Sequence, residues 1–165
     1  MGLDINGWME VQTNGKWIGK TNLKDLDRNY SAFGILFGVR TSNILPIGHN
    51  GKPGEISKEM KIELEDYPED LKFFVHWVLW SEISTLEITD GTVDYPIYMT
   101  ELYRKTEKGL VFKGKKDIPS LINYEEHVKL MKDGELETKN YIYKAVPEIE
   151  KFYFDEGWLE LFEQA

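Results

Sequence analysis

The sequence predicts a single α+β domain over residues 1–165, with a mainly antiparallel sheet packed around one buried central helix at about residues 27–40. Three observations support this fold class. The chain has 165 residues, of which 41% are hydrophobic and 13% aromatic, so it is long and apolar enough to bury one core. Strand-like segments with turn signals recur along it, and no repeat or low-complexity linker divides it. One segment near the N-terminus is apolar on every side, which indicates a buried helix.

A β-hairpin is expected within residues 3–23. Met9 and Val11 alternate with residues of the opposite face, which is the period of a half-buried strand. Asn14-Gly15 follows, and this dipeptide is the strongest signal for a two-residue hairpin turn. The N-terminal segment is therefore predicted to contain two antiparallel strands.

The apolar helix is predicted from the spacing of its side chains. Asp27 is expected to cap its N-terminus. At 100° per residue, Tyr30, Phe33 and Phe37 share one face, Ala32, Ile35, Leu36 and Val39 the next, and Ser31, Gly34 and Gly38 the remaining strip. Glycines inside a helix cost about 1 kcal/mol each relative to alanine, so this small strip predicts another backbone lying close against it. Only the two ends of the helix are then left to reach solvent.

Local signals predict the elements that follow. Residues 41–57 form a long loop, and Ser57 caps a short amphipathic helix that runs to about Glu65. Ser81 is expected to cap another short helix, and residues 92–114 are expected to be strands with a turn near 107–109. Periodicity alone leaves residues 71–80 and 140–154 open between strand and helix, and a last helix is expected from Asp155.

A further helix is predicted between Ser120 and Gly134. Ser120 is expected to cap it and Gly134 to end it. Its apolar stripe would consist of Leu121, Tyr124, Val128 and Met131. With that stripe buried, His127 is expected to face outward and to have no special role.

The residue types present exclude several kinds of chemistry. The chain has no cysteine, which excludes disulfides, thiolate zinc sites, iron–sulfur clusters and cysteine nucleophiles. Its three histidines, at positions 49, 76 and 127, have no metal-ligand spacing, so a zinc hydrolase is disfavoured, whereas a Mg²⁺ site made of carboxylates alone stays open. No motif indicates a cofactor. The N-terminus lacks the regions of a signal peptide, and no apolar run reaches about 18 residues, so a cytoplasmic protein without membrane association is expected.

The charge of the chain is uneven. The net charge is −9, yet residues 1–60 carry +1 and residues 61–165 carry −10. Nine of the fourteen glycines also lie in the first 60 residues. The overall field disfavours direct binding to duplex nucleic acid. A small anion is better placed in the N-terminal third, and a basic protein partner is better placed on the acidic remainder.

The best candidate for a binding site joins the start of the buried helix to the glycine-rich loop. Arg28, Asn29 and Tyr30 lie at the helix N-terminus, where free backbone N–H groups and the helix dipole favour an anion. The loop GHNGKPG at 48–54 adds His49, Asn50, Lys52 and several backbone N–H groups. Structural alternatives stay open: Arg28 would pair with a neighbouring aspartate, and the loop would be a plain connection.

Other candidate residues have simpler explanations. Arg40 is expected to stabilise the C-terminal end of the helix, and His76 to be a satisfied core residue. No pair of carboxylates stands out as a general acid and base, and no Gly-x-Ser-x-Gly motif is present, so no catalytic residue is assigned. The sequence therefore leans away from an enzyme.

Three segments carry a resemblance to a known family: GLDINGWMEV, DRNYSAFGILFGVR and PIGHNGKPGEIS. They resemble a family of small uncharacterised proteins encoded by bacteriophages and prophages, mainly over residues 2–57. HWVLWSEI is a fainter match. The resemblance implies a phage or bacterial origin, in an infected or lysogenic host, and brings no activity and no site residues.

For such a protein, counter-defence is a reasonable expectation, and three mechanisms fit the chain. The first is capture of an anionic nucleotide signal, without chemistry, at Arg28, Asn29 and the 48–54 loop. The second is inhibition of a basic host protein by an acidic surface that imitates nucleic acid. The third, less favoured, is nucleotide hydrolysis with carboxylate-held Mg²⁺.

Overall fold

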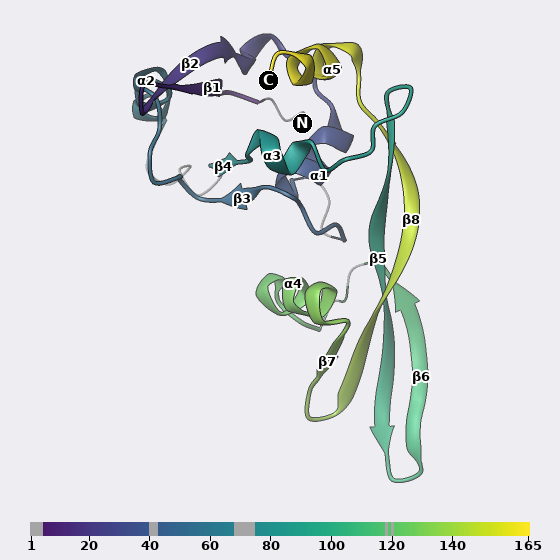
Figure 1. Cartoon of the computed structure of the whole chain (residues 1–165). Helices are drawn as coiled ribbons and strands as arrows, with labels where there is room; N and C mark the ends of the chain where they lie inside the picture. The colour runs from purple at the N-terminus through teal and green to yellow at the C-terminus, as the bar shows by residue number, and fades with distance from the viewer. Residues whose placement is uncertain (1–4, 40–42, 68–74, 118, 120) are drawn as a thin grey trace.

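The computed structural model describes residues 5–39, 43–67, 75–117, 119 and 121–165. Its elements belong to two parts (Figure 1). The helical lobe, residues 5–91 and 154–165, contains β1 (Trp8–Thr13), β2 (Lys16–Asn22), the 3-10 helix η1 (Leu23–Asp25), α1 (Tyr30–Phe37), β3 (His49–Asn50), α2 (Lys58–Glu65), β4 (His76–Trp77), α3 (Trp80–Ile83) and α5 (Glu156–Glu163). The sheet arm, residues 92–153, contains β5 (Thr92–Thr106), β6 (Gly109–Lys116), α4 (Tyr124–Asp133), β7 (Glu135–Glu137) and β8 (Tyr141–Tyr153).

Every strand pair among these elements is antiparallel, and the predicted α+β class is confirmed. β1 pairs with β2, β3 pairs with β4, and the arm is a four-stranded sheet in the order β6-β5-β8-β7. β5 has 15 residues, so it is about 50 Å long. β6 pairs only with the second half of β5, from Thr100 to Thr106. The arm therefore begins at the lobe as the paired strands β5 and β8 and widens away from it (Figure 1).

The N-terminal hairpin has the predicted turn. Asn14 and Gly15 connect β1 to β2 with φ values of 51° and 77°, the left-handed pair that a two-residue hairpin turn requires. Ser57 caps α2 as predicted, since its hydroxyl accepts the N–H of Met60 at 3.1 Å. Ser57 is also fully buried, and its own N–H donates to Glu10 at 2.7 Å, which ties α2 to β1.

The buried central helix is confirmed, but it is shorter than predicted. α1 spans Tyr30–Phe37, and its buried residues are Ala32, Phe33, Gly34, Ile35 and Leu36. Asn29, not Asp27, caps it. Gly38 ends it at φ 69°, and a side chain there would come within 3.0 Å of Pro46. Glycine is needed at this end for both its conformation and its size.

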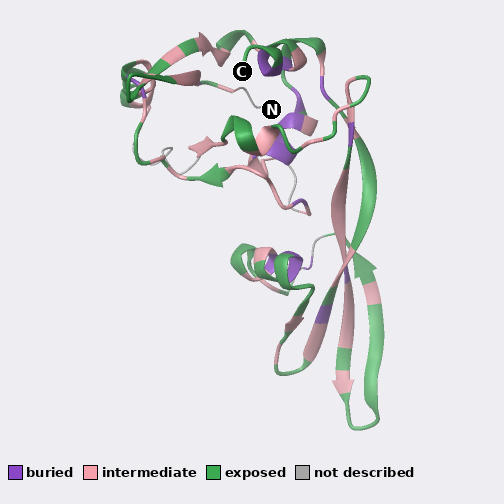
Figure 2. Ribbon diagram, viewed as in Figure 1, coloured by how far each residue is buried: buried purple, intermediate pink, exposed green. Residues whose placement is uncertain are grey.

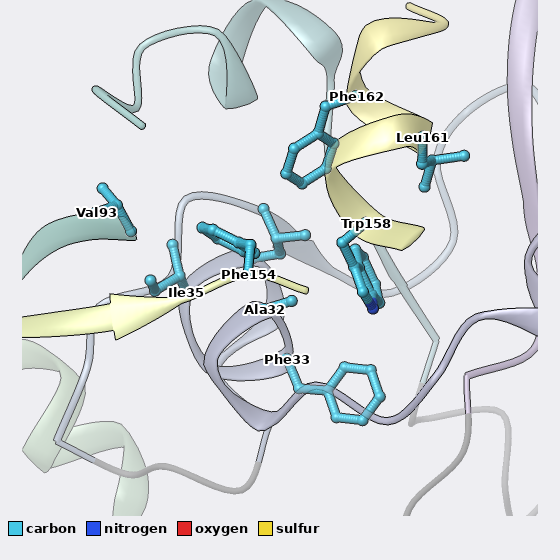
Figure 3. Packing of buried hydrophobic residues seen from close by; sticks show 9 residues of the cluster. Ala32, Phe33, Ile35, Val93, Phe154, Trp158, Leu161 and Phe162 are labelled. Carbon is cyan, nitrogen blue, oxygen red and sulfur yellow. The ribbon is translucent and has the colours of Figure 1, made fainter. Parts of the chain in front are cut away.

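The core around α1 comes from distant parts of the chain. Figure 3 shows Val93 from β5, Phe154 after β8, and three α5 residues packed on the helix: Trp158, Leu161 and Phe162. Phe33 meets Trp158 edge-on, with ring centroids 6.0 Å apart, and Phe154 meets Phe162 in the same way at 5.6 Å. The start of β5 and the end of β8 thus enter this core, which fixes the arm to the lobe.

The helix of the arm differs from the prediction. α4 begins at Tyr124 and is capped by Asn123, whose side chain accepts the N–H of Glu126; Ser120 lies outside the described residues. The buried face is shifted from the predicted stripe, although Met131 belongs to both. Its buried residues are His127, Leu130 and Met131, whereas Leu121 and Tyr124 are exposed (Figure 2). The expectation that His127 faces outward is wrong, since only 3% of this residue is exposed.

Of the two segments left open between strand and helix, 140–154 is a strand over almost its whole length, whereas the described part of 71–80 contains a two-residue strand and the first residue of α3. His76–Trp77 forms β4, and residues 68–74 lie outside the described part. Residues 141–153 form β8, which pairs with β5 along its whole length. The last helix, α5, begins at Glu156 close to the expected start and is capped by Asp155, but Ser81 does not cap α3, because that helix already begins at Trp80. Within the described chain, every helix is too short or too polar to cross a membrane.

Candidate functional site

The N-terminal end of α1 is already engaged with the protein. The Asn29 side chain accepts the N–H of Ala32 at 2.9 Å, and the Asn29 carbonyl accepts that of Phe33 at 3.0 Å. The indole of Trp158 donates to the carbonyl of Asp27 at 3.1 Å, which anchors the preceding turn to α5. Asn29 therefore acts as a buried helix cap, and one of the backbone donors that an anion would use is occupied.

The other two predicted residues at this end lie on the surface. Arg28 is exposed and interacts with other groups of the chain, so both interpretations of it stay predictions. Tyr30 is 45% exposed, and its ring lies edge-on to Phe33 at 5.9 Å. Arg40 lies outside the described residues.

The glycine-rich loop lies at the opposite end of α1. Gly48 donates its N–H to Leu36 at 2.8 Å, and Ile47 donates to Ile35 at 2.9 Å, so β3 begins beside the last turn of the helix. Eight helical residues separate the two ends by about 12 Å. The structure thus does not bring Arg28, Asn29 and Tyr30 together with His49, Asn50 and Lys52.

His49 instead lies in a small cluster with residues that sequence reasoning did not connect to it. Its Nε2 lies 2.5 Å from Oε1 of Glu82 in α3, and its ring stacks on Trp77 of β4 with centroids 4.2 Å apart. Asn50 lies opposite His76 in the same β3–β4 pair, and Lys52 is exposed beyond it. The short β3–β4 ladder creates this cluster, and its two-residue strands are too short to be recognised from periodicity.

Glu82 orients the imidazole of His49. Its second oxygen accepts the N–H of Leu79 at 2.8 Å, where it completes the first turn of α3. This backbone hydrogen bond and, to a lesser extent, the bond to His49 hold the pKa of Glu82 below its usual value. An ionised carboxylate beside Nε2 fixes the orientation of the imidazole ring. The His49–Glu82 pair lies at the surface, with 43% of the His49 side chain accessible to solvent.

The remaining histidines have structural environments. Burial lowers the pKa of both His76 and His127. The His76 ring packs 5.8 Å from Phe37, but its buried Nδ1 has no hydrogen-bond partner among the described residues, so within them it is not the satisfied core residue that was expected. Among the described residues, no three His, Asp or Glu side chains are grouped so that they could hold a metal ion.

The charged residues are distributed differently between the two parts of the structure than between the two segments of the sequence compared above. Residues 1–91 and 154–165, which include the helical lobe, hold nine basic and eighteen acidic residues. Residues 92–153, the sheet arm, hold eleven of each. The net charge of −9 therefore belongs to the lobe and not to the last two thirds of the chain. This division follows from tertiary contacts that return residues 154–165 to α1, and no window along the sequence shows it.

The acidic side chains of α5 form a row. Glu156, Glu160 and Glu163 are exposed and lie four and three residues apart, which places them on one face. The opposite face of α5 is buried by Trp158, Leu161 and Phe162. At the C-terminal end, Thr21 and Lys20 of β2 hydrogen-bond to Gln164. The carboxylates are thus held on a helix that is fixed at both ends.

Neither a protein-family model, nor a curated protein, nor a solved structure matches this chain. The resemblance of residues 2–57 to phage-encoded proteins stays a prediction.

Proposed function

We propose that this protein acts by binding and not by chemistry, and that the acidic face of its helical lobe docks onto a basic surface of a partner protein. The observation that carries the proposal is the exposed row of Glu156, Glu160 and Glu163 on α5. Along the helix axis these residues are about 6 Å and 4.5 Å apart, so they offer a short rigid line of negative charge. Proteins that bind nucleic acid recognise such a line of charge in a phosphate backbone.

The rigidity of α5 supports this proposal. Asp155 caps the helix with a hydrogen bond to Trp158 at 3.2 Å, and Trp158 is only 2% exposed. Because the backbone is fixed by the core, docking would order only the glutamate side chains. A preorganised charged surface loses less conformational freedom on binding and also accelerates association by electrostatic steering.

The large surface of the molecule also supports a binding role. A compact protein of 19.3 kDa exposes about 8,500 Å², whereas this chain exposes 10792 Å². The difference exceeds the roughly 800 Å² that each partner contributes to a protein–protein interface of standard size. Figure 2 shows that exposed residues run along β6 and along much of β8 in the arm.

Counter-defence in an infected or lysogenic bacterial cytoplasm is the setting that the family resemblance implies for this activity. An acidic face that imitates nucleic acid would inhibit a basic host protein by occupying its nucleic-acid site. Nucleotide capture at α1 is a weaker proposal, because Asn29 caps the helix and the 48–54 loop lies at its other end. Nucleotide hydrolysis with Mg²⁺ has no support among the described residues, because no group of their side chains could hold a metal ion.

The proposal is tested by competition with DNA. A fluorescein-labelled duplex is bound to a basic nucleoid-associated protein, and the purified chain is titrated into the complex while fluorescence anisotropy is followed. We expect the wild-type chain to release the duplex, and more strongly at low salt than at moderate salt. Replacing Glu156, Glu160 and Glu163 by Gln should abolish the release.

The matched control replaces three exposed carboxylates of the arm, Glu107, Glu135 and Glu150, by Gln. It changes the net charge by the same amount and should leave the release unchanged. If wild type releases no duplex, or if both triple variants lose the release equally, the acidic face of α5 is not a docking surface.

A further inference from the structure

The hairpin formed by β5 and β6 differs in charge from the rest of the molecule. Residues 100–116, the paired part of the hairpin, contain six Lys or Arg residues and two Glu residues, in a chain whose net charge is −9. The hairpin turn lies at the end of the arm farthest from the lobe (Figure 1). Thr100, where the pairing with β6 begins, lies eight residues or about 27 Å along β5 from Thr92, which is more than twice the screening length of about 8 to 10 Å at physiological salt. The acidic lobe therefore does not cancel the positive potential at the hairpin.

One face of this hairpin contains a hollow with a volume of about 60 Å³. It is bounded by the β5–β6 hairpin, by β8, and by Pro119 and Leu121 ahead of α4. Its lining includes the polar side chains of Thr100, Lys113 and Lys116, the backbone of Gly114, and the apolar surfaces of Leu102 and Tyr143. Among the residues that the structure describes, no Asp or Glu lines it. The space exceeds that of a single water molecule and suits a small polyatomic group.

The hydroxyl of Thr100 lacks a partner in this hollow. Thr100 is 3% exposed, and its Oγ1 has no hydrogen bond to any residue that the structure describes. Buried hydroxyl groups are nearly always hydrogen-bonded, so an unpartnered one beside a hollow is evidence that a ligand atom completes it. The register places Thr100 directly opposite Lys116, so the hydroxyl and this lysine share one face of the sheet.

A β-bulge brings the second lysine to the same face. Leu102 pairs with Gly114 and Tyr103 pairs with Phe112, so Lys113 is the extra residue of β6. Without this irregularity, strand alternation would place Lys113 and Lys116 on opposite faces. Gly114 has φ 139°, and a side chain there would meet no atom within 4 Å, which leaves the mouth of the hollow open.

Two lysines of the opposite face are neutralised by carboxylates. Lys115 hydrogen-bonds to Glu148 at 2.6 Å, and Lys105 pairs with Glu137. The lysines that line the hollow meet no carboxylate in its lining. Adjacent residues of one strand, Lys115 and Lys116, thus belong to different electrostatic environments.

From this geometry we infer that the hollow binds a phosphate group. Lys113 and Lys116 supply the positive charge, and the Thr100 hydroxyl donates a hydrogen bond to a phosphate oxygen. Leu102 and Tyr143 form an apolar floor that limits solvation of the ion and strengthens these contacts. The phosphate belongs either to a free nucleotide or to the backbone of a single strand. This site is separate from the acidic face of α5 and does not depend on it.

Isothermal titration at low salt, with the full-length chain, tests the inference. The probes are inorganic phosphate, 5′-AMP and a ten-nucleotide oligo(dT). We expect binding of 5′-AMP, of the oligonucleotide or of both; the stronger of the two identifies the source of the phosphate. Lys116→Gln and Thr100→Val should each weaken that binding roughly tenfold. Lys115→Gln, the matched control, should change it less than twofold.

Thr100→Val keeps the shape of the side chain and removes the unpartnered hydroxyl, so its thermal unfolding midpoint should not fall. Three results would overturn the inference: no probe binds, Lys115→Gln weakens binding as much as Lys116→Gln, or Thr100→Val leaves binding unchanged. The α5 triple variant should retain phosphate binding, which separates a failure of this site from a failure of the docking surface.

Discussion

The backbone N–H of Gly48 donates to the carbonyl of Leu36 at 2.8 Å, so the glycine-rich loop is attached to the C-terminal end of α1. A Cβ atom at position 48 would lie 2.2 Å from this carbonyl oxygen and 2.8 Å from that of Trp77. Glycine is required at position 48 because two backbone segments approach it. This contact also separates the loop from Arg28 and Asn29, which lie at the other end of the helix.

Gly48→Ala should therefore destabilise the fold by about 3 kcal/mol or more, because the clashing atoms belong to backbone and cannot turn aside. Urea unfolding followed by tryptophan fluorescence measures the change. Gly54→Ala is the matched control in the same loop, since no atom lies within 4 Å of its Cβ position. Equal stability of the two variants would contradict the close approach at Gly48.

Replacement of the helix cap distinguishes the structure from the sequence prediction. Asn29→Ala removes the side-chain acceptor of the Ala32 N–H and should cost about 1 to 2 kcal/mol of unfolding free energy. Asp27→Ala, at the cap position expected from sequence, should change it by less than about 0.5 kcal/mol, because that side chain is exposed. Chemical denaturation of both variants makes the comparison, and the reverse order would place the cap at Asp27.

Glu82 should contribute to stability in a pH-dependent way. Its pKa in the folded protein is lowered from the usual 4.5, first by the Leu79 N–H and then by His49. Its contribution is therefore present above about pH 4.5 and is lost as the pH falls through the lower, folded value. The unfolding free energy of Glu82→Gln, measured between pH 3 and pH 7, should decrease less at acid pH than that of the wild-type protein. Glu87→Gln, an exposed carboxylate nearby, should retain the wild-type profile.

His127 should make the protein less stable in mild acid. Burial lowers its pKa in the folded state below the usual 6.5, so the unfolded chain binds a proton more readily. Stability from this residue is present above pH 6.5 and is lost as the pH falls towards the folded value. His127→Leu also removes a buried Nε2 that has no partner among the described residues. The stability that this variant gains over wild type should be larger at pH 5 than at pH 8. An identical pH dependence in denaturation curves of the two proteins would refute this.

The accuracy of the sequence predictions followed the range of the interactions involved. The Asn14-Gly15 turn and the Ser57 cap were predictable because each is made by residues within three positions of one another. The caps of α1 and α4 were misplaced because several polar residues near each helix start can accept a backbone N–H, and the folded chain uses Asn29 and Asn123. His127 was assigned to the wrong face because tertiary packing decides which face of α4 is buried.

The sequence by itself determined that this protein is α+β, that one glycine-containing helix is buried, and that the chain is acidic. Local propensity, periodicity and composition are enough for these statements, since each depends on neighbouring residues or on a sum over the chain. Only the tertiary structure decided where the charges lie, which candidate residues meet, and which polar groups are left without partners. These depend on strand register and on contacts such as Thr100 with Lys116 or Trp158 with Asp27, which join residues far apart in the chain.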